Sequence, residues 1–179
     1  MKKKILTIFL ISFLTSCKTS DNTKTVVIED RYSLTIPSFL AKVNNLNEDA
    51  SLQYQHTWKE FYVIVIDELK TDFQVALDQN NLTETHSNDI NSYSNLLLDN
   101  FEQVISVSNK SNIVDTTINN FPAKLLTING RVEGIDAFYS LAFIESKKRY
   151  YQIMAWTLSS KKYEYDEKMR ELIYTFREL

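Results

Sequence analysis

Two histidines are the first residues to test for chemistry, because imidazole serves both as a metal ligand and as a general base. His56 and His86 are the only histidines; the first falls in a strand-like run and the second precedes a helix-like one. A metal site would need a third ligand from carboxylates that are scattered along the chain. The sequence also lacks GxSxG, HExxH, CxxC and a Gly-rich phosphate loop. We therefore expect two partly exposed histidines, no catalytic residue, no metal and no cofactor.

A pair of adjacent carboxylates, Asp67 and Glu68, follows an apolar run at residues 61–66. Two neighbouring carboxylates can work as a general acid and a general base. Successive residues of a strand point to opposite faces, however, so these two cannot easily share one substrate. We expect a solvated strand end here.

Aromatic residues are abundant, with ten Tyr, ten Phe and two Trp. These types are enriched at protein interfaces, but each large ring also buries roughly 150–250 Å² in a core. Most of them are therefore expected in the core. The candidate surface for a protein partner is Trp58, Lys59 and Tyr62, which lie beside a predicted hairpin.

The N-terminus has the pattern of an export signal. Lys2, Lys3 and Lys4 precede an apolar run at residues 5–14, which is too short to span a bilayer as a helix, since that takes about 20 residues. The following Leu-Thr-Ser-Cys, ending at Cys17, resembles the lipobox of bacterial lipoprotein precursors. The resemblance implies that residues 1–16 are a signal peptide and that Cys17, the only cysteine, carries the lipid.

Composition after the cysteine fits one acidic domain. Loss of the three signal-peptide lysines moves the net charge from -3 to -6, and the remaining Lys and Arg form no stripe, so we expect no nucleic-acid partner. Residues 17–24 are polar and are predicted to be a lipidated tether. Residues 25–179 are predicted to fold as one domain.

Apolar periodicity predicts both strands and helices. Strands are expected at 32–36, 52–57, 61–66, 123–128, 137–144 and 150–157, and helices around 73–77, 90–105 and 165–176. The run at 61–66 is apolar on both parities, so both of its faces must be covered. Short connections, with residues 129–134 joining the first pair of a three-strand meander, make the pairing antiparallel. The expected fold class is α+β: an antiparallel sheet with helices covering both faces, a three-layer sandwich.

The order of these elements resembles PsbP-like proteins. The resemblance rests on Tyr-Ser-Leu-Thr-Ile-Pro at residues 32–37, the two-faced strand at 61–66, the long helix, Phe-Pro-Ala at 121–123 and the final strand and helix at 150–176. Bacterial members include many small lipoproteins, among them the DcrB type. Plant PsbP serves the oxygen-evolving side of photosystem II and other relatives bind protein partners, but fold analogy does not transfer an activity.

Two functions remain open from the sequence. The first is a membrane-tethered, non-enzymatic binding or assembly module that has an envelope protein as partner, on the outer membrane facing the periplasm. The second is a small-molecule carrier or enzyme with a pocket between sheet and helices. Polar groups converging in an otherwise apolar cavity would favour the second function.

Overall fold

The computed structural model describes residues 22–179, so the predicted signal peptide and Cys17 lie outside the described residues. None of the helices in 22–179 has the length and apolarity needed to cross a bilayer. In chain order the elements are β1 (Thr23–Ile28), β2 (Tyr32–Pro37), β3 (Ala41–Lys42), β4 (Leu52–His56), β5 (Phe61–Leu69), α1 (Lys70–Gln79), α2 (Ile90–Val104), β6 (Ser106–Lys110), β7 (Val114–Ile118), β8 (Phe121–Val132), β9 (Ile135–Glu145), β10 (Arg149–Leu158), a 3-10 turn (Ser159–Lys161), α3 (Lys162–Tyr174) and β11 (Arg177–Glu178).

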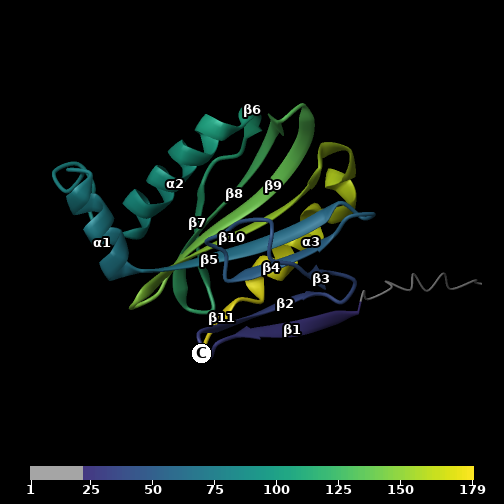
Figure 1. Ribbon diagram of the computed structural model, residues 1–179, viewed down its shortest axis with the longest axis horizontal. Helices are drawn as coiled ribbons and strands as arrows, with labels where there is room; N and C mark the ends of the chain where they lie inside the picture. Colours follow the sequence, from purple (N-terminus) through teal and green to yellow (C-terminus); the bar gives the residue numbers. More distant parts are fainter. Residues whose placement is uncertain (1–21) are drawn as a thin grey trace, which may run out of the picture.

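An eight-stranded antiparallel sheet forms the middle layer (Figure 1). Its order is β3-β4-β5-β10-β9-β8-β6, with β7 also paired to β8, which confirms the predicted three-strand meander. Along β10 the side chains alternate as period two requires: Tyr151, Ile153 and Ala155 pack on one face, and Tyr150 and Met154 pack on the other. The large sheet is thus buried on both faces.

The β8–β9 connection is tighter than the sequence indicated. Val132 pairs with Ile135, so only Glu133 and Gly134 form the turn. Both have positive φ, 50° and 84°, the backbone that a two-residue hairpin turn of the favoured twist requires. The prediction that residues 129–134 form the loop is therefore wrong, because the two strands extend almost to the turn.

Helix α2 covers one face of the large sheet, and α1 projects from the end of β5 (Figure 1). Phe73 and Leu77 of α1 pack with Tyr93 and Leu98 of α2 in one apolar cluster, which also includes inward side chains of β8, β9 and β10. Helix α2 begins after Asp89, whose carboxylate accepts a hydrogen bond from the backbone N–H of Ser92.

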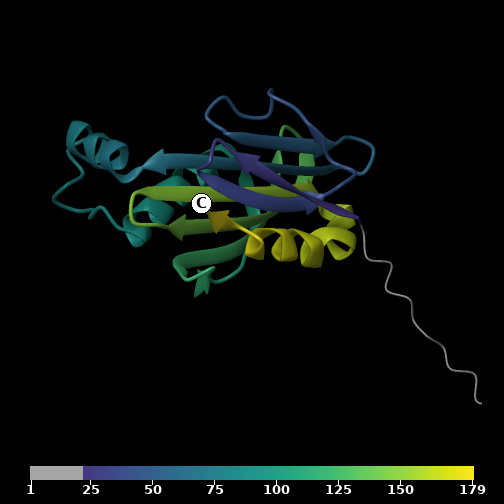
Figure 2. The ribbon, with the colours of Figure 1, turned by 90° about the horizontal axis from the view of Figure 1, so that it is seen from below.

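The other face is covered by α3 together with a small antiparallel sheet, β1-β2-β11 (Figure 2). Met169 and Ile173 of α3 and Tyr32 and Leu34 of β2 belong to one buried cluster with β5, β9 and β10. Helices on both faces confirm the predicted α+β sandwich. The small sheet was not predicted in full, because β1 and β11 were not expected.

The first strand, β1, changes the expected boundary of the domain. Thr23 and Lys24 were assigned to the tether, but they are the first two residues of β1 and pair with Pro37 and Ile36 of β2. The Lys24 ammonium donates to the Leu40 carbonyl oxygen at 2.6 Å. The folded domain therefore includes Thr23 and Lys24, which the prediction had assigned to the tether.

Candidate functional site

A row of aromatic rings crosses the large sheet on the α2 face. Trp156 of β10 is the cross-strand neighbour of Tyr62 on β5 and of Tyr139 on β9. The Tyr62 and Trp156 rings stack 5.2 Å apart with planes within 10°, and Tyr139 meets Phe101 of α2 edge to face at 5.0 Å. Because antiparallel register brings opposite side chains together, three strands and one helix supply a continuous aromatic surface.

This aromatic row is partly open to solvent. Tyr62, Trp156 and Phe101 are half-buried, and a hollow of about 150 Å³ beside Tyr62 and Trp156 is also lined by Ile135, whose exposure is 54%. Burial raises the pKa of Tyr62, and together with the hydrogen bond that its hydroxyl donates to Glu60 Oε2 at 2.7 Å it brings this pKa to about 12. Tyr62 is therefore neutral at physiological pH.

The structure separates the three residues that the sequence grouped as one partner surface. Trp58 and Lys59 lie in the turn between β4 and β5, where Trp58 is 91% exposed and the Lys59 ammonium lies 5.1 Å from the centre of the Phe39 ring. Tyr62 instead belongs to the aromatic row on the α2 face. The grouping was based on adjacency in sequence, whereas the strand carries Tyr62 into another environment.

A second exposed aromatic lies near Trp58 and was missed by sequence reasoning. Tyr163, in the first turn of α3, is 98% exposed. The preceding Lys161 donates from its ammonium to the Trp58 carbonyl oxygen at 3.3 Å, which joins the start of α3 to the β4–β5 turn. One signal was available: Tyr163 falls off the apolar stripe formed by Tyr165, Met169 and Ile173.

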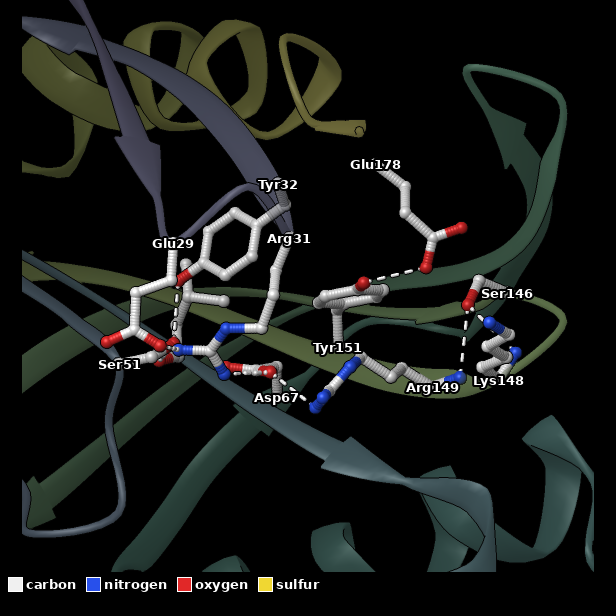
Figure 3. A network of polar contacts seen from close by, with 11 residues as sticks. Glu29, Arg31, Tyr32, Ser51, Asp67, Ser146, Lys148, Arg149, Tyr151 and Glu178 are labelled. Atoms are coloured by element: carbon white, nitrogen blue, oxygen red, sulfur yellow. Dashed lines mark hydrogen bonds and ion pairs between the residues drawn. The ribbon is translucent and has the colours of Figure 1, made fainter.

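The expected solvated strand end at Asp67 is wrong, because this carboxylate is buried and lies between Arg31 and Arg149 (Figure 3). Its side chain is 1% exposed, and Oδ2 accepts from Arg31 at 2.5 Å and from Arg149 at 2.8 Å. Nearby, the Tyr151 hydroxyl donates to Glu178 at 2.7 Å. These contacts join β5 and β10 to the β1–β2 turn and to the C-terminus. A carboxylate held between two guanidinium groups is suited to fixing these elements rather than to transferring a proton.

Glu68 lines a cleft between α2 and the large sheet, and Asp67 and Arg149 also belong to the lining of this cleft. The two adjacent carboxylates therefore border one hollow, which the alternation of the strand did not predict. The cleft measures about 510 Å³ and its lining includes Ile66, Glu68, Asp72, Tyr93 and Leu97. Burial raises the pKa of Glu68; a hydrogen bond from Tyr93 lowers it, and the charges of Asp72 and Asp49 raise it. Polar groups therefore converge with apolar ones in this cleft.

Neither histidine lines the cleft or contacts Asp67. His56, at the end of β4, accepts a hydrogen bond from the Lys59 backbone N–H at its Nδ1 atom, and its ring packs edge-on against Phe39. His86, before α2, shares a hydrogen bond with Thr85. Both are half-buried, and within residues 22–179 no three His, Cys, Asp or Glu residues are placed to hold a metal ion.

Comparison with known proteins informs the fold. No family model and no curated protein matches the sequence. The solution structure of the cyanobacterial PsbP protein CyanoP, from Synechocystis sp. PCC 6803, matches with a TM-score of 0.56 and 10% identity, over 93% of this chain and 99% of that chain. The fold is PsbP-like. The crystal structure of PA94, a protein of unknown function from Pseudomonas aeruginosa, matches with a TM-score of 0.46 and 14% identity, over 86% of this chain and 94% of that chain.

Two aromatic surfaces, one half-buried and one exposed, thus lie at one end of the large sheet. The aromatic row lies on the α2 face, whereas Trp58 and Tyr163 project from the β4–β5 turn and the start of α3. The buried network around Asp67 lies at the other end, where β5 ends and β10 begins (Figures 1 and 3).

Proposed function

We propose that this chain is a lipid-anchored, non-enzymatic binding module of the bacterial cell envelope, with an envelope protein as its partner. The lipobox-like sequence at Cys17 supports the anchor. The observation that carries partner binding is the half-buried aromatic row of Tyr62, Trp156 and Phe101 with the exposed Ile135 beside it. Aromatic side chains next to an exposed aliphatic one are typical of the centre of a protein interface.

The proposed location is the outer membrane, on the periplasmic side. Three acyl chains on Cys17 would hold the chain firmly, because one chain binds a membrane only marginally and two already suffice. Cells fed a labelled fatty acid should label the wild-type chain and not Cys17→Ser. Equal labelling of both chains would refute the anchor.

Partner binding is tested by capturing the tagged, lipidated chain from native membranes. Ile135→Glu places a charge beside the aromatic row, and Val75→Glu on α1 is the matched control, because the two side chains are 54% and 50% exposed. We expect Ile135→Glu to lose a co-purifying envelope protein that Val75→Glu retains. The same set of proteins with both variants would refute this surface.

A second candidate function is a small-molecule carrier, and the cleft that contains Glu68 favours it. Its volume of about 510 Å³ lies in the range of small-molecule sites, and acidic groups converge there with apolar side chains. Four carboxylates, those of Asp49, Asp67, Glu68 and Asp72, line the cleft together with one guanidinium, that of Arg149. This excess of negative charge would select a ligand with a positive charge. Native mass spectrometry of gently purified protein should then show a bound small molecule that is lost with Glu68→Gln and Asp72→Asn. Ligand-free wild type would refute this function.

A further inference from the structure

The place where the chain enters the domain limits how the domain can face a membrane, if Cys17 carries the proposed lipid anchor. Thr23, the first residue of β1, pairs with Pro37, and Lys24 bonds Leu40. Thr23 is six positions after Cys17 in the sequence, and an extended chain spans at most ~3.5 Å per residue. The start of β1 therefore lies within about 20 Å of the lipidated residue.

Two strongly exposed aromatics lie at this same end of the molecule. β1, β5 and α3 all begin there (Figures 1 and 2). Trp58 in the turn before β5 is 91% exposed and Tyr163 in α3 is 98% exposed, the highest values among large hydrophobic residues in 22–179. With Lys59, Lys161 and Lys162 they form what we call the anchor-proximal surface.

The chemistry of the anchor-proximal surface fits lipid headgroups. Trp and Tyr are enriched at membrane interfaces, where an apolar ring with a polar group suits the headgroup level. Lysine extends an apolar stem and keeps its ammonium in the polar layer. No ion pair joins these three lysines to a carboxylate within the described residues; Lys59 lies over the Phe39 ring and Lys162 over the Phe138 ring.

Acidic groups lie near the same surface, and their negative charge weakens its attraction to anionic lipid headgroups. Glu60 is engaged by the Tyr62 hydroxyl, and Glu164 is exposed on α3. The processed chain is also acidic as a whole, so charge alone would not bring the domain to a membrane. The short tether does so instead, because it turns docking into an intramolecular event at high effective concentration.

We propose that Trp58 and Tyr163 rest in the headgroup layer of the anchoring membrane, with Lys59, Lys161 and Lys162 contacting lipid phosphates. The β4–β5 turn and the start of α3 then face the bilayer, and the Asp67 network faces away from it. We assign the headgroup layer and not a protein to this surface, because Trp58 and Tyr163 are 91% and 98% exposed at the end of the molecule where the short tether joins β1. This orientation rests on the proposed lipid anchor.

Tryptophan quenching by brominated phosphatidylcholine tests the orientation. The full lipidated chain is reconstituted in vesicles of phosphatidylcholine and phosphatidylglycerol, and Trp156→Phe leaves Trp58 as the only tryptophan. The control carries Val75→Trp with both native tryptophans changed to Phe, because Val75 is half exposed on α1 at the other end. We expect the brominated lipid to quench Trp58 severalfold more strongly than the probe at position 75. Equal quenching at both positions would overturn the proposal.

Paired lysine variants test the phosphate contacts. Lys161→Ser with Lys162→Ser should reduce the quenching of Trp58, and Lys147→Ser with Lys148→Ser, an exposed pair in the β9–β10 turn, should leave it unchanged. Fatty-acid labelling of the same preparation separates two failures. An unlabelled chain overturns the anchor and the docking that rests on it. A labelled chain with unquenched Trp58 overturns docking alone. If Trp58 is protected from the brominated lipid only when a protein co-purifies, the surface belongs to a protein partner instead.

Discussion

Asp67 shows how the setting of one side chain decides its role. Its Oδ2 accepts from two arginines, while Oδ1 and the Arg31 Nε atom are buried without a hydrogen-bond partner among the described residues. Burying an ionised carboxylate costs free energy unless a positive charge is paired with it. The guanidinium groups of Arg31 and Arg149 offset this desolvation cost for Asp67. Arg31 comes from the β1–β2 turn and Arg149 from β10. Asp67 therefore links the small sheet to the large sheet.

Removal of the Asp67 carboxylate should therefore destabilise the domain. We expect Asp67→Ala to lower the free energy of unfolding by about 2–4 kcal/mol, because it leaves two guanidinium groups without their shared acceptor. Both arginine side chains are about one quarter exposed and can regain some hydration. Urea unfolding followed by circular dichroism measures the loss. Asp136→Asn, which breaks an exposed pair with Arg131, should leave the unfolding midpoint almost unchanged, and equal effects would contradict this linking role.

Glu68 gives the domain a pH dependence of a defined sign. Burial raises its pKa in the folded state, so the folded chain holds the proton more tightly than the unfolded chain does. The stability that this adds is fully present below the unfolded pKa of ~4.3 and is lost as pH rises through the raised value. Glu68→Gln should thus raise the melting temperature at neutral pH and have little effect in acid. Glu167→Gln on the exposed side of α3 controls for loss of one negative charge, and an equal gain from it would contradict the assignment.

At the scale of elements, the sequence predicted the strands and helices whose apolar residues recur at regular spacing. The alternation of Tyr151, Ile153 and Ala155 correctly predicted β10 and its two buried faces. The apolar stripe of α3 correctly predicted a helix packed against the sheet. The strand β1 was missed because it alternates between exposed and half-buried residues, with polar residues at its start. It forms because β2 offers a partner, which is a tertiary effect.

The candidate site was only partly predictable for the same reason. Trp58 and Tyr62 were recognised as surface candidates by residue type. The stacking of Tyr62 on Trp156 depends on the register between β5 and β10, which joins residues far apart in sequence. The link between Trp58 and Lys161 depends likewise on where α3 begins. Residue type alone does not report such pairings.

The docking of α3 gives a prediction at this scale. Ile173 is 1% exposed within the cluster that joins α3 to β2 and the large sheet, whereas the next residue, Tyr174, is 47% exposed. Ile173→Asp should cost at least about 3 kcal/mol, since it loses apolar burial and places an unpaired charge in the core. Tyr174→Asp is the matched control and should shift the thermal midpoint little. Equal melting curves for Ile173→Asp and the wild type would show that α3 is not docked.

Over the whole molecule, the two apolar clusters share the strands of one sheet. Phe138 and Ala142 of β9 point into the α3 cluster, while Tyr139 and Leu141 of the same strand point into the α2 cluster. Neither cluster can lose its packing without disturbing the strands that support the other. The two covering layers should therefore depend on each other even though no cluster spans the sheet.

This dependence predicts one cooperative unfolding transition. Trp156 reports on the α2 face, and Trp58→Phe leaves it as the only tryptophan, so its fluorescence can be compared with far-ultraviolet circular dichroism during urea unfolding. We expect the two curves to coincide, as they do for small single domains. Ile173→Asp, introduced on the opposite face, should move the Trp156 transition to lower urea by the same amount as the circular dichroism transition. If the Trp156 signal kept its wild-type midpoint while part of the dichroism was lost earlier, the α3 layer would be unfolding on its own, and the sheet would not couple its two faces.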